Sequence, residues 1–176
     1  MALAATRVAP ASIVSVDGYD VAQICREGHI VTTMAARYPQ FRQDFCGKCG
    51  APTTMTCENC GSAIRGYYHV SGVIGGSVDI DRPSFCHKCG RPYPWTEAAL
   101  DAARAMADEL DGLKPDEREA LKSSLDDLVQ DTVRTPVAVL RFKKLALKAG
   151  SEGAAALRDV LVGVVTEGVR RGIWGA

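Results

Sequence analysis

The sequence predicts an α+β protein, because the composition of the chain changes sharply at Trp95-Thr96. All seven cysteines, all three histidines and all five tyrosines lie before this point, in short runs of strand-forming residues broken by turns. After it, Ala, Leu, Asp, Glu and Lys recur at helical spacing. We therefore expect a β-rich domain over residues 1–95 and a bundle of about four α-helices over residues 96–176.

The cysteines form a metal-ligand pattern. Six of the seven lie in three C-x-x-C-G motifs, at residues 46–50, 57–61 and 86–90, and Cys25 stands four residues before His29. An odd number of cysteines argues against a disulfide framework, and paired thiols in a reducing compartment more often bind metal. Four pairs of ligands close two tetrahedral zinc sites with no position left open, so the β-rich domain is predicted to be a double zinc-ribbon module. The predicted ligands of the two structural zinc ions are Cys25, His29, Cys46, Cys49, Cys57, Cys60, Cys86 and Cys89.

The backbone conformation at the end of each motif explains why glycine occurs there. Glycine permits the left-handed backbone that aims amide N–H groups at the cysteine sulfurs. Its recurrence in the same place three times makes the metal interpretation specific.

Two pairings of these ligands are open. Sequential pairing joins Cys25 and His29 to the first motif and the second motif to the third, which gives one site of three cysteines and one histidine and one site of four cysteines. Interleaved pairing joins the first motif to the second across only seven intervening residues, and joins the third to Cys25 and His29. We favour sequential pairing, because both of its loops are long enough for a small hairpin.

Short strands are expected between the metal ligands. Asp17-Gly18 is a hairpin signal that separates a strand at 12–16 from one at 19–25, which would end at Cys25. The other expected strands lie at 30–33, 66–71 and 77–80.

Helical spacing predicts four segments in the second half. The first runs over 97–110 with Thr96 as N-cap, the second begins at Pro115, and the third runs from Thr135-Pro136 to about residue 149, where Gly150 ends it. The last, over 154–173, contains Gly163 and Gly168, so a buried strand is an alternative there. Its many apolar residues suggest packing in the bundle core or against a second copy of the chain.

The third predicted helix carries a basic stripe. At about 100° per residue, Arg141, Lys144 and Lys148 share one narrow arc, and Leu140 and Leu147 lie just beyond it. A separate apolar arc holds Ala138, Phe142, Leu145, Ala146 and Ala149. We expect a nearly enclosed helix whose basic stripe faces either solvent or a partner. A solvent-exposed stripe is the commoner of the two outcomes.

Charge and hydropathy narrow the function. No stretch approaches the roughly 20 apolar residues of a membrane span, and residues 1–11 lack the core of a secretion signal, so we expect a soluble cytoplasmic protein. The 21 basic and 21 acidic residues cancel. This balance counts against nucleic-acid binding, which remains an alternative through Lys48, Arg65, Lys88 and Arg91.

The favoured hypothesis is a non-enzymatic interaction module that binds a protein partner or acts within a larger assembly. Zinc would hold exposed side chains rigid, and the candidate contacts on the ribbon are Tyr67, Tyr68, His69, Tyr93 and Trp95. Two alternatives stay open: Tyr93 and Trp95 could pack the ribbon against the first helix, and a lone histidine such as His69 is usually structural. Catalysis at an open zinc site or by C-x-x-C redox exchange is disfavoured, because the ligand count closes both sites and no catalytic motif is found.

Residues 20–97 resemble an uncharacterised bacterial family, domain of unknown function 2321. The resemblance rests on C-R-E-G-H-I-V from Cys25, F-C-G-K-C-G-A-P-T from Phe45, I-R-G-Y-Y-H-V from Ile64, and F-C-H-K-C-G-R-P-Y-P-W-T-E from Phe85. It implies a zinc-ribbon-like module followed by helices, with the cysteines and His29 as ligands. It implies no activity.

Overall fold

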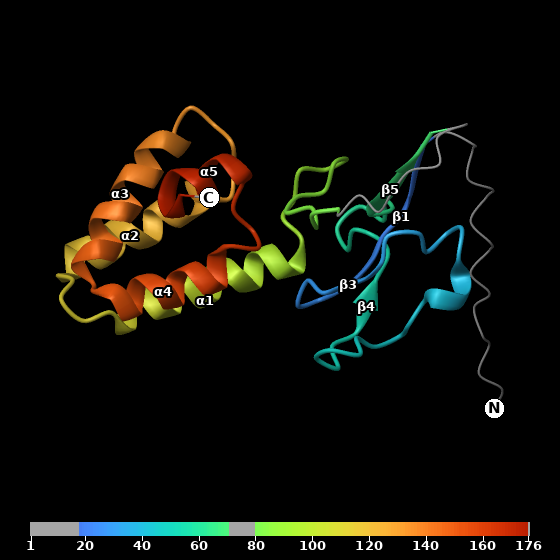
Figure 1. Ribbon diagram of the computed structural model, residues 1–176, viewed down its shortest axis with the longest axis horizontal. Helices are drawn as coiled ribbons and strands as arrows, with labels where there is room; N and C mark the ends of the chain where they lie inside the picture. The colour runs from blue at the N-terminus through green and yellow to red at the C-terminus, as the bar shows by residue number, and fades with distance from the viewer. Residues whose placement is uncertain (1–17, 71–79, 176) are drawn as a thin grey trace. The chain divides into compact units, whose positions relative to one another are not determined.

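The computed structural model describes residues 18–70 and 80–175. Their fold is α+β, as predicted, with small antiparallel sheets followed by helices (Figure 1). The described residues divide into two compact units, 18–25 with 29–70 and 80–81, and 26–28 with 82–175. The third C-x-x-C-G motif is therefore grouped with the helices by its contacts, although its composition belongs with the β-rich half.

The first unit contains two small antiparallel sheets. In one, β1 (Gly18–Val21) pairs with β5 (Arg65–His69). In the other, β2 (Gln23–Cys25) lies between β3 (Ile30–Thr32) and β4 (Thr53–Thr54). A short 3-10 turn, η1 (Pro39–Phe41), lies between β3 and β4 in the chain.

The predicted strand over 19–25 is divided between the two sheets. It breaks at the buried Ala22, whose N–H donates to the Ile64 carbonyl oxygen at 2.9 Å. Its second part, β2, ends at Cys25 as expected, and β3 and β5 confirm the strands expected at 30–33 and 66–71. The strand expected at 12–16 and most of the one at 77–80 lie outside the described residues.

Gly66 allows the backbone of β5 to approach the neighbouring segments closely. A β-carbon at this position would overlap the Thr33 carbonyl oxygen and lie 2.8 Å from the Ala22 nitrogen. The same approach lets the Tyr67 N–H donate to the Thr33 carbonyl oxygen at 2.9 Å. A residue without a side chain is required here because backbone atoms, which cannot move aside, fill the space.

Five helices lie in the described part of the second unit, one more than the approximate count expected. They are α1 (Pro94–Glu109), α2 (Pro115–Leu128), α3 (Thr135–Lys148), α4 (Ser151–Leu161) and α5 (Glu167–Trp174). The extra helix arises in the segment 154–173, where neither the single helix nor the strand considered for it forms. Thr166 begins α5, because its side-chain oxygen accepts a hydrogen bond from the Val169 N–H at 3.3 Å.

Helix α1 begins three residues earlier than predicted. Pro94 occupies its first turn, where proline needs no hydrogen-bond donor, and Tyr93 is the N-cap. Thr96, the predicted cap, is buried inside the helix, where its hydroxyl donates to the Ser84 carbonyl oxygen at 2.9 Å. Helix α3 begins at Thr135, as expected, and Arg134 is its N-cap.

The helices pack through leucine-rich stripes. Helix α2 contacts α1 and α3, α4 contacts α1 and α3, and α5 contacts α3 (Figure 1). Leu121, Leu125 and Leu128 of α2 are fully buried. Phe142 of α3, which belongs to the predicted apolar arc, is buried as well. Helix α3 is less enclosed than predicted, because Leu140 and Leu147 stay 68% and 79% exposed. None of the helices within residues 18–70 and 80–175 is long and apolar enough to cross a membrane.

Candidate metal centres

The three C-x-x-C-G motifs adopt the same tight turn. In the first, the Cys46 N–H donates to the Ala51 carbonyl oxygen, and the Gly50 N–H donates to the Cys46 carbonyl oxygen, both at 2.8 Å. Equivalent bonds at 2.8–2.9 Å close the turns at 57–61 and 86–90. Each final glycine has a positive φ, between +70° and +73°, as the sequence predicts. The backbone of each motif is thus shaped to direct two thiols toward one point.

Four predicted ligands meet in the first candidate centre. The Cys25 Sγ lies 3.5 Å from the His29 Nδ1 and 3.8 Å from the Cys49 Sγ. The Cys46 Sγ lies 3.7 Å from the His29 Nδ1. All four ligand atoms lie within 4.8 Å of one another.

These separations fit tetrahedral zinc. Zinc binds sulfur at about 2.3 Å and imidazole nitrogen at about 2.0–2.1 Å, so a regular tetrahedron separates two sulfurs by about 3.8 Å and a sulfur from a nitrogen by about 3.5–3.6 Å. The observed sulfur–sulfur distance of 3.8 Å and the sulfur–nitrogen distances of 3.5 and 3.7 Å match these values. Three cysteines and one histidine therefore provide a complete ligand set for one ion.

Cys57, Cys60, Cys86 and Cys89 form the second candidate centre. Their sulfur atoms also lie within 4.8 Å of one another. The two centres contain the ligands that sequential pairing predicts, and the interleaved alternative is not found among the described residues. Both groups of ligands could hold zinc.

Comparison with models of protein families places the chain in one of them. The family model described as "Uncharacterized protein conserved in bacteria (DUF2321)" matches residues 18–173. The chain belongs to this family. The match extends through most of α5, well beyond the residues that carry the resemblance noted from the sequence. Searches of curated proteins and of solved structures found no match.

Strands β2 and β4 position the first centre of this DUF2321 protein. Cys25 ends β2, and its N–H donates to the carbonyl oxygen of His29 at 3.0 Å, so the tight turn between them brings the two side chains together. β2 also pairs with β4, where Cys25 lies opposite Thr53. The motif at 46–50 directly precedes β4, so the same sheet holds all four ligands.

Gln23 binds the segment that leads to the first C-x-x-C-G motif. It was not among the predicted residues. Its buried side chain donates from Nε2 to the Gln43 carbonyl oxygen at 2.7 Å and to the Thr53 Oγ1 at 2.8 Å. Its Oε1 accepts from the Gln43 N–H at 3.0 Å. These bonds fasten the segment before Cys46 to strand β2, so Gln23 is a positioning residue for the ligands.

Two thiols of the first centre differ in pKa. The Lys48 N–H donates to the Cys46 Sγ at 3.4 Å and, with the neighbouring sulfurs, lowers the pKa of the Cys46 thiol to about 6. For Cys49, the Ala51 N–H acts to lower the pKa, but reduced hydration and the sulfurs of Cys46 and Cys25 outweigh it, and the pKa of Cys49 is raised. Adjacent thiolates repel one another, and a divalent cation is the natural compensation.

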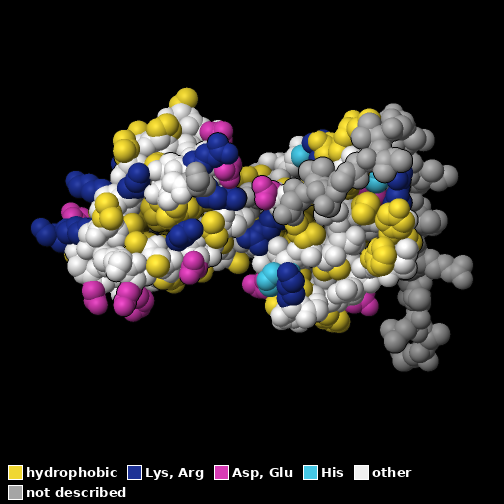
Figure 2. Space-filling model, in the orientation of Figure 1, with side chains coloured by type: hydrophobic (Ala, Val, Ile, Leu, Met, Phe, Trp, Pro, Cys, Tyr) yellow, Lys and Arg dark blue, Asp and Glu magenta, His cyan; other side chains and the backbone are white. Residues whose placement is uncertain are grey.

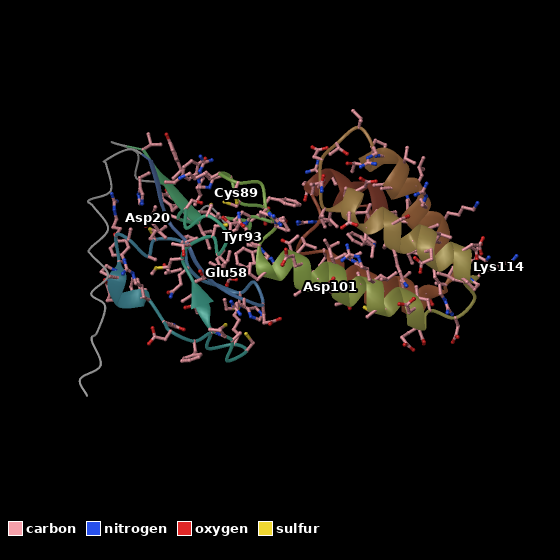
Figure 3. All side chains as sticks on the ribbon, turned by 180° about the vertical axis from the view of Figure 1, so that it is seen from behind. Asp20, Glu58, Cys89, Tyr93, Asp101 and Lys114 are labelled. Carbon is pink, nitrogen blue, oxygen red and sulfur yellow. The ribbon has the colours of Figure 1, made fainter. Side chains whose placement is uncertain are left out.

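His69 takes part in a buried pair rather than in either centre. Its Nε2 lies 3.2 Å from the Oδ2 of Asp20, which is labelled on β1 in Figure 3. The other carboxylate oxygen of Asp20 accepts from the Ala36 N–H at 3.0 Å. Asp20 is fully buried and joins β1, β5 and the segment after β3. This arrangement fits the structural alternative for His69.

The other candidate contact residues differ in exposure. Tyr93 and Trp95 are buried and stack with ring centroids 4.7 Å apart, and the Trp95 Nε1 donates to the Pro83 carbonyl oxygen at 2.8 Å. Their positions fit the packing alternative. On β5, Tyr67 is partly buried against His69, whereas Tyr68 is half exposed and contacts Tyr19 edge to face.

Tyr19 extends the exposed aromatic surface and was missed by sequence reasoning. It is 51% exposed, and the guanidinium of Arg65 lies over its ring at 4.7 Å. Its location could be recognised only from the pairing of β1 with β5, which places Tyr19 opposite Tyr68. In the helical unit, Arg141, Lys144 and Lys148 are all exposed, and Lys148 forms an ion pair with Glu117 at 2.6 Å.

Proposed function

We propose that this DUF2321 protein is a non-enzymatic zinc-ribbon adaptor, in which two structural zinc ions hold a surface in place for a protein partner. The observation that carries the proposal is the tetrahedral spacing of the Cys25, His29, Cys46 and Cys49 ligand atoms. Four protein ligands leave no position for a substrate or a reactive water. The second centre, with four cysteine sulfurs, supports the same conclusion.

The exposed aromatic cluster supports partner binding. Tyr19, Tyr68 and Arg65 lie together on the β1–β5 sheet, and the two tyrosines are about half exposed. Tyrosine and arginine supply much of the contact energy in protein interfaces. Zinc binding needs reduced thiols, which the cytoplasm maintains, so we place the protein there. It could act in the cytoplasm as part of a larger bacterial assembly.

Cobalt substitution tests whether the centres are closed. Cobalt in a tetrahedral thiolate site has visible absorption bands that change when an external ligand binds. We expect the spectrum of the cobalt-loaded protein to be unchanged by added azide. A change in the spectrum would reveal an open coordination position and contradict a purely structural role.

Capture from a bacterial host tests the adaptor role. Tagged intact protein and a Cys46→Ser variant are compared after nuclease treatment of the extract. We expect the intact protein to retain a specific protein that the variant, with its first centre broken, loses. A parallel capture from untreated extract tests the nucleic-acid alternative, which is favoured if nucleic acid is retained there and no protein is retained after nuclease treatment. If neither capture retains anything, the adaptor role is contradicted.

A further inference from the structure

One face of α3 carries apolar side chains at the spacing of a coiled-coil seam. Val137, Leu140 and Leu147 lie on the helix, and Val133 lies in the turn just before it. They are 58%, 68%, 79% and 96% exposed in that order. With Lys144, their positions alternate by four and three residues, which is the heptad pattern of seam positions a and d. We call these five residues the α3 stripe.

The α3 stripe is separate from the core face of the helix. Ala138, Phe142, Leu145 and Ala146 point into the bundle and are buried. At about 100° per residue, the α3 stripe occupies a different arc, about 80° wide. Single exposed apolar residues are ordinary, but a seam that runs the length of a helix on its outer side indicates an interaction surface.

The charged side chains of α3 itself are all basic. Helix α3 has no acidic residue and four basic ones, Arg141, Lys143, Lys144 and Lys148. Lys148 pairs with Glu117, and Lys143 donates to the Gly172 carbonyl oxygen. Arg141 and Lys144 have no side-chain partner among the described residues. Figure 2 shows basic and hydrophobic side chains next to each other over the region of α3.

This charge pattern identifies the chemistry of the occupant. A second α3 laid on the stripe would place Arg141 and Lys144 against basic residues in either orientation, which disfavours self-association. The first 17 residues of the chain contain only one acidic residue, Asp17, and so offer little compensation. A nucleic-acid backbone would match the charge but would leave Leu140 and Leu147 against phosphates.

We propose that the α3 stripe docks an acidic amphipathic helix of a partner protein. An apolar seam on that helix would cover Val137, Leu140 and Leu147, and acidic side chains beside the seam would pair with Arg141 and Lys144. The proposal rests on the proposed adaptor function. It adds a second surface, which lies on the helical unit and does not depend on the first metal centre, and it names the kind of partner that fits this surface.

Designed peptides test the docking surface on the full-length, zinc-loaded protein. A fluorescent three-heptad peptide carries Leu at a and d and Glu at e and g, and a matched peptide carries Lys at e and g. Fluorescence anisotropy measures binding. We expect the Glu peptide to bind at least about tenfold more tightly than the Lys peptide, and its binding to weaken as salt is added.

Surface variants locate the binding. Leu140→Ser with Leu147→Ser should weaken the Glu peptide about tenfold or more, and Arg141→Glu with Lys144→Glu should shift the preference to the Lys peptide. Phe41→Ser and Arg37→Glu remove an exposed apolar and an exposed basic side chain elsewhere, and should leave binding unchanged. Because these side chains are exposed, we expect each variant to fold, and circular dichroism checks this.

Several results would overturn the proposal. They are no binding of the Glu peptide, equal binding of both peptides, insensitivity to the leucine variants, a dimer that Leu140→Ser dissociates, or displacement of the peptide by random-sequence duplex DNA. If the leucine and charge variants still capture the same host protein as the intact chain, the docking surface is wrong while the adaptor function stands. If the intact chain captures no protein, the adaptor function itself fails.

Discussion

Gly50 shows how a single backbone angle supports a metal site. Its φ is +73°, and a β-carbon there would meet nothing within 4 Å. Gly50→Ala should therefore destabilise the first unit by about 1–2 kcal/mol through backbone strain alone. Chemical unfolding of the zinc-loaded protein measures this free energy.

Gly47 provides the matched control within the same motif. Its φ is not positive, and an added β-carbon would lie 3.8 Å from the Gln43 Oε1, an ordinary contact. Gly47→Ala should change the free energy of unfolding little. Equal losses for the two alanine variants would show that side-chain volume, and not φ, is what the motif restricts.

Gln23 gives a second prediction for single residues. Gln23→Leu removes the partners of the Gln43 N–H and carbonyl oxygen, and a buried polar group without a partner costs about 1–3 kcal/mol. We expect zinc to transfer faster from this variant to a colorimetric chelator. Gln40→Leu, at an exposed position of η1, should release zinc at the rate of the unaltered protein. Identical rates for both variants would remove the positioning role from Gln23.

The candidate ligands could be predicted from the sequence, and their supporting residues could not. Spacing alone grouped Cys25 and His29 with the first motif, because a metal site imposes residue types at short, recognisable intervals. Gln23 and Asp20 act on Gln43 and Ala36, which are 20 and 16 residues away. Nothing in their local sequence distinguishes them from other polar residues, so only the folded backbone reveals their roles.

Helices α2 and α3 are joined by an ion pair whose strength depends on pH. Glu117 accepts from the Lys148 Nζ at 2.6 Å and from the N–H of Lys114, labelled in Figure 3, at 3.0 Å. Lys148, and then the Lys114 N–H, hold the pKa of Glu117 below its usual value. Because the folded-state pKa is the lower one, the stabilisation is present above the unfolded pKa and is lost as pH falls through the folded pKa.

Glu117→Gln should therefore lower the unfolding temperature at neutral pH and have no effect in acid well below the folded-state pKa. Thermal unfolding followed by circular dichroism at both pH values measures the difference. Glu109→Gln is the control, because Glu109 is exposed and has no side-chain partner among the described residues. A loss from Glu117→Gln that is equally large in acid would exclude the ion pair as its cause.

Helix boundaries were predictable where one signal acted alone. Pro115 begins α2 as expected, because proline suits a first turn and no competing signal lies nearby. In the segment 154–173, the pattern of apolar residues predicts a single element. The chain instead turns between α4 and α5, where Val164 and Val165 are buried and Thr166 caps the next helix. Tertiary burial of the turn outweighed local helix propensity.

At the scale of the whole molecule, composition and contacts divide the chain differently. Composition changes after residue 95, because strand-rich and helix-rich segments use different residues. The contacts group 82–93 with the helices, through bonds such as that from the Ser84 Oγ to the Val164 carbonyl oxygen at 3.0 Å. A boundary drawn from residue types cannot register such long-range bonds.

Loss of one ligand should affect one unit more than the other. Cys46→Ser should abolish the first centre, whose zinc would contribute on the order of 10–16 kcal/mol of apparent binding free energy, and unfold the first unit. The helices should persist, because the buried leucines of α2 and α4 form their own core. Limited proteolysis should then cut within residues 18–70 and spare α1 to α5, whereas cleavage spread evenly over both units would contradict this independence.

The number of zinc ions bound by the folded chain tests the central claim most directly. Native mass spectrometry of the protein purified in zinc-containing medium, with circular dichroism to show that it is folded, gives this number. Two closed centres predict a mass increase that corresponds to two zinc ions per chain. A folded protein that carries one zinc ion, or none, would contradict the account.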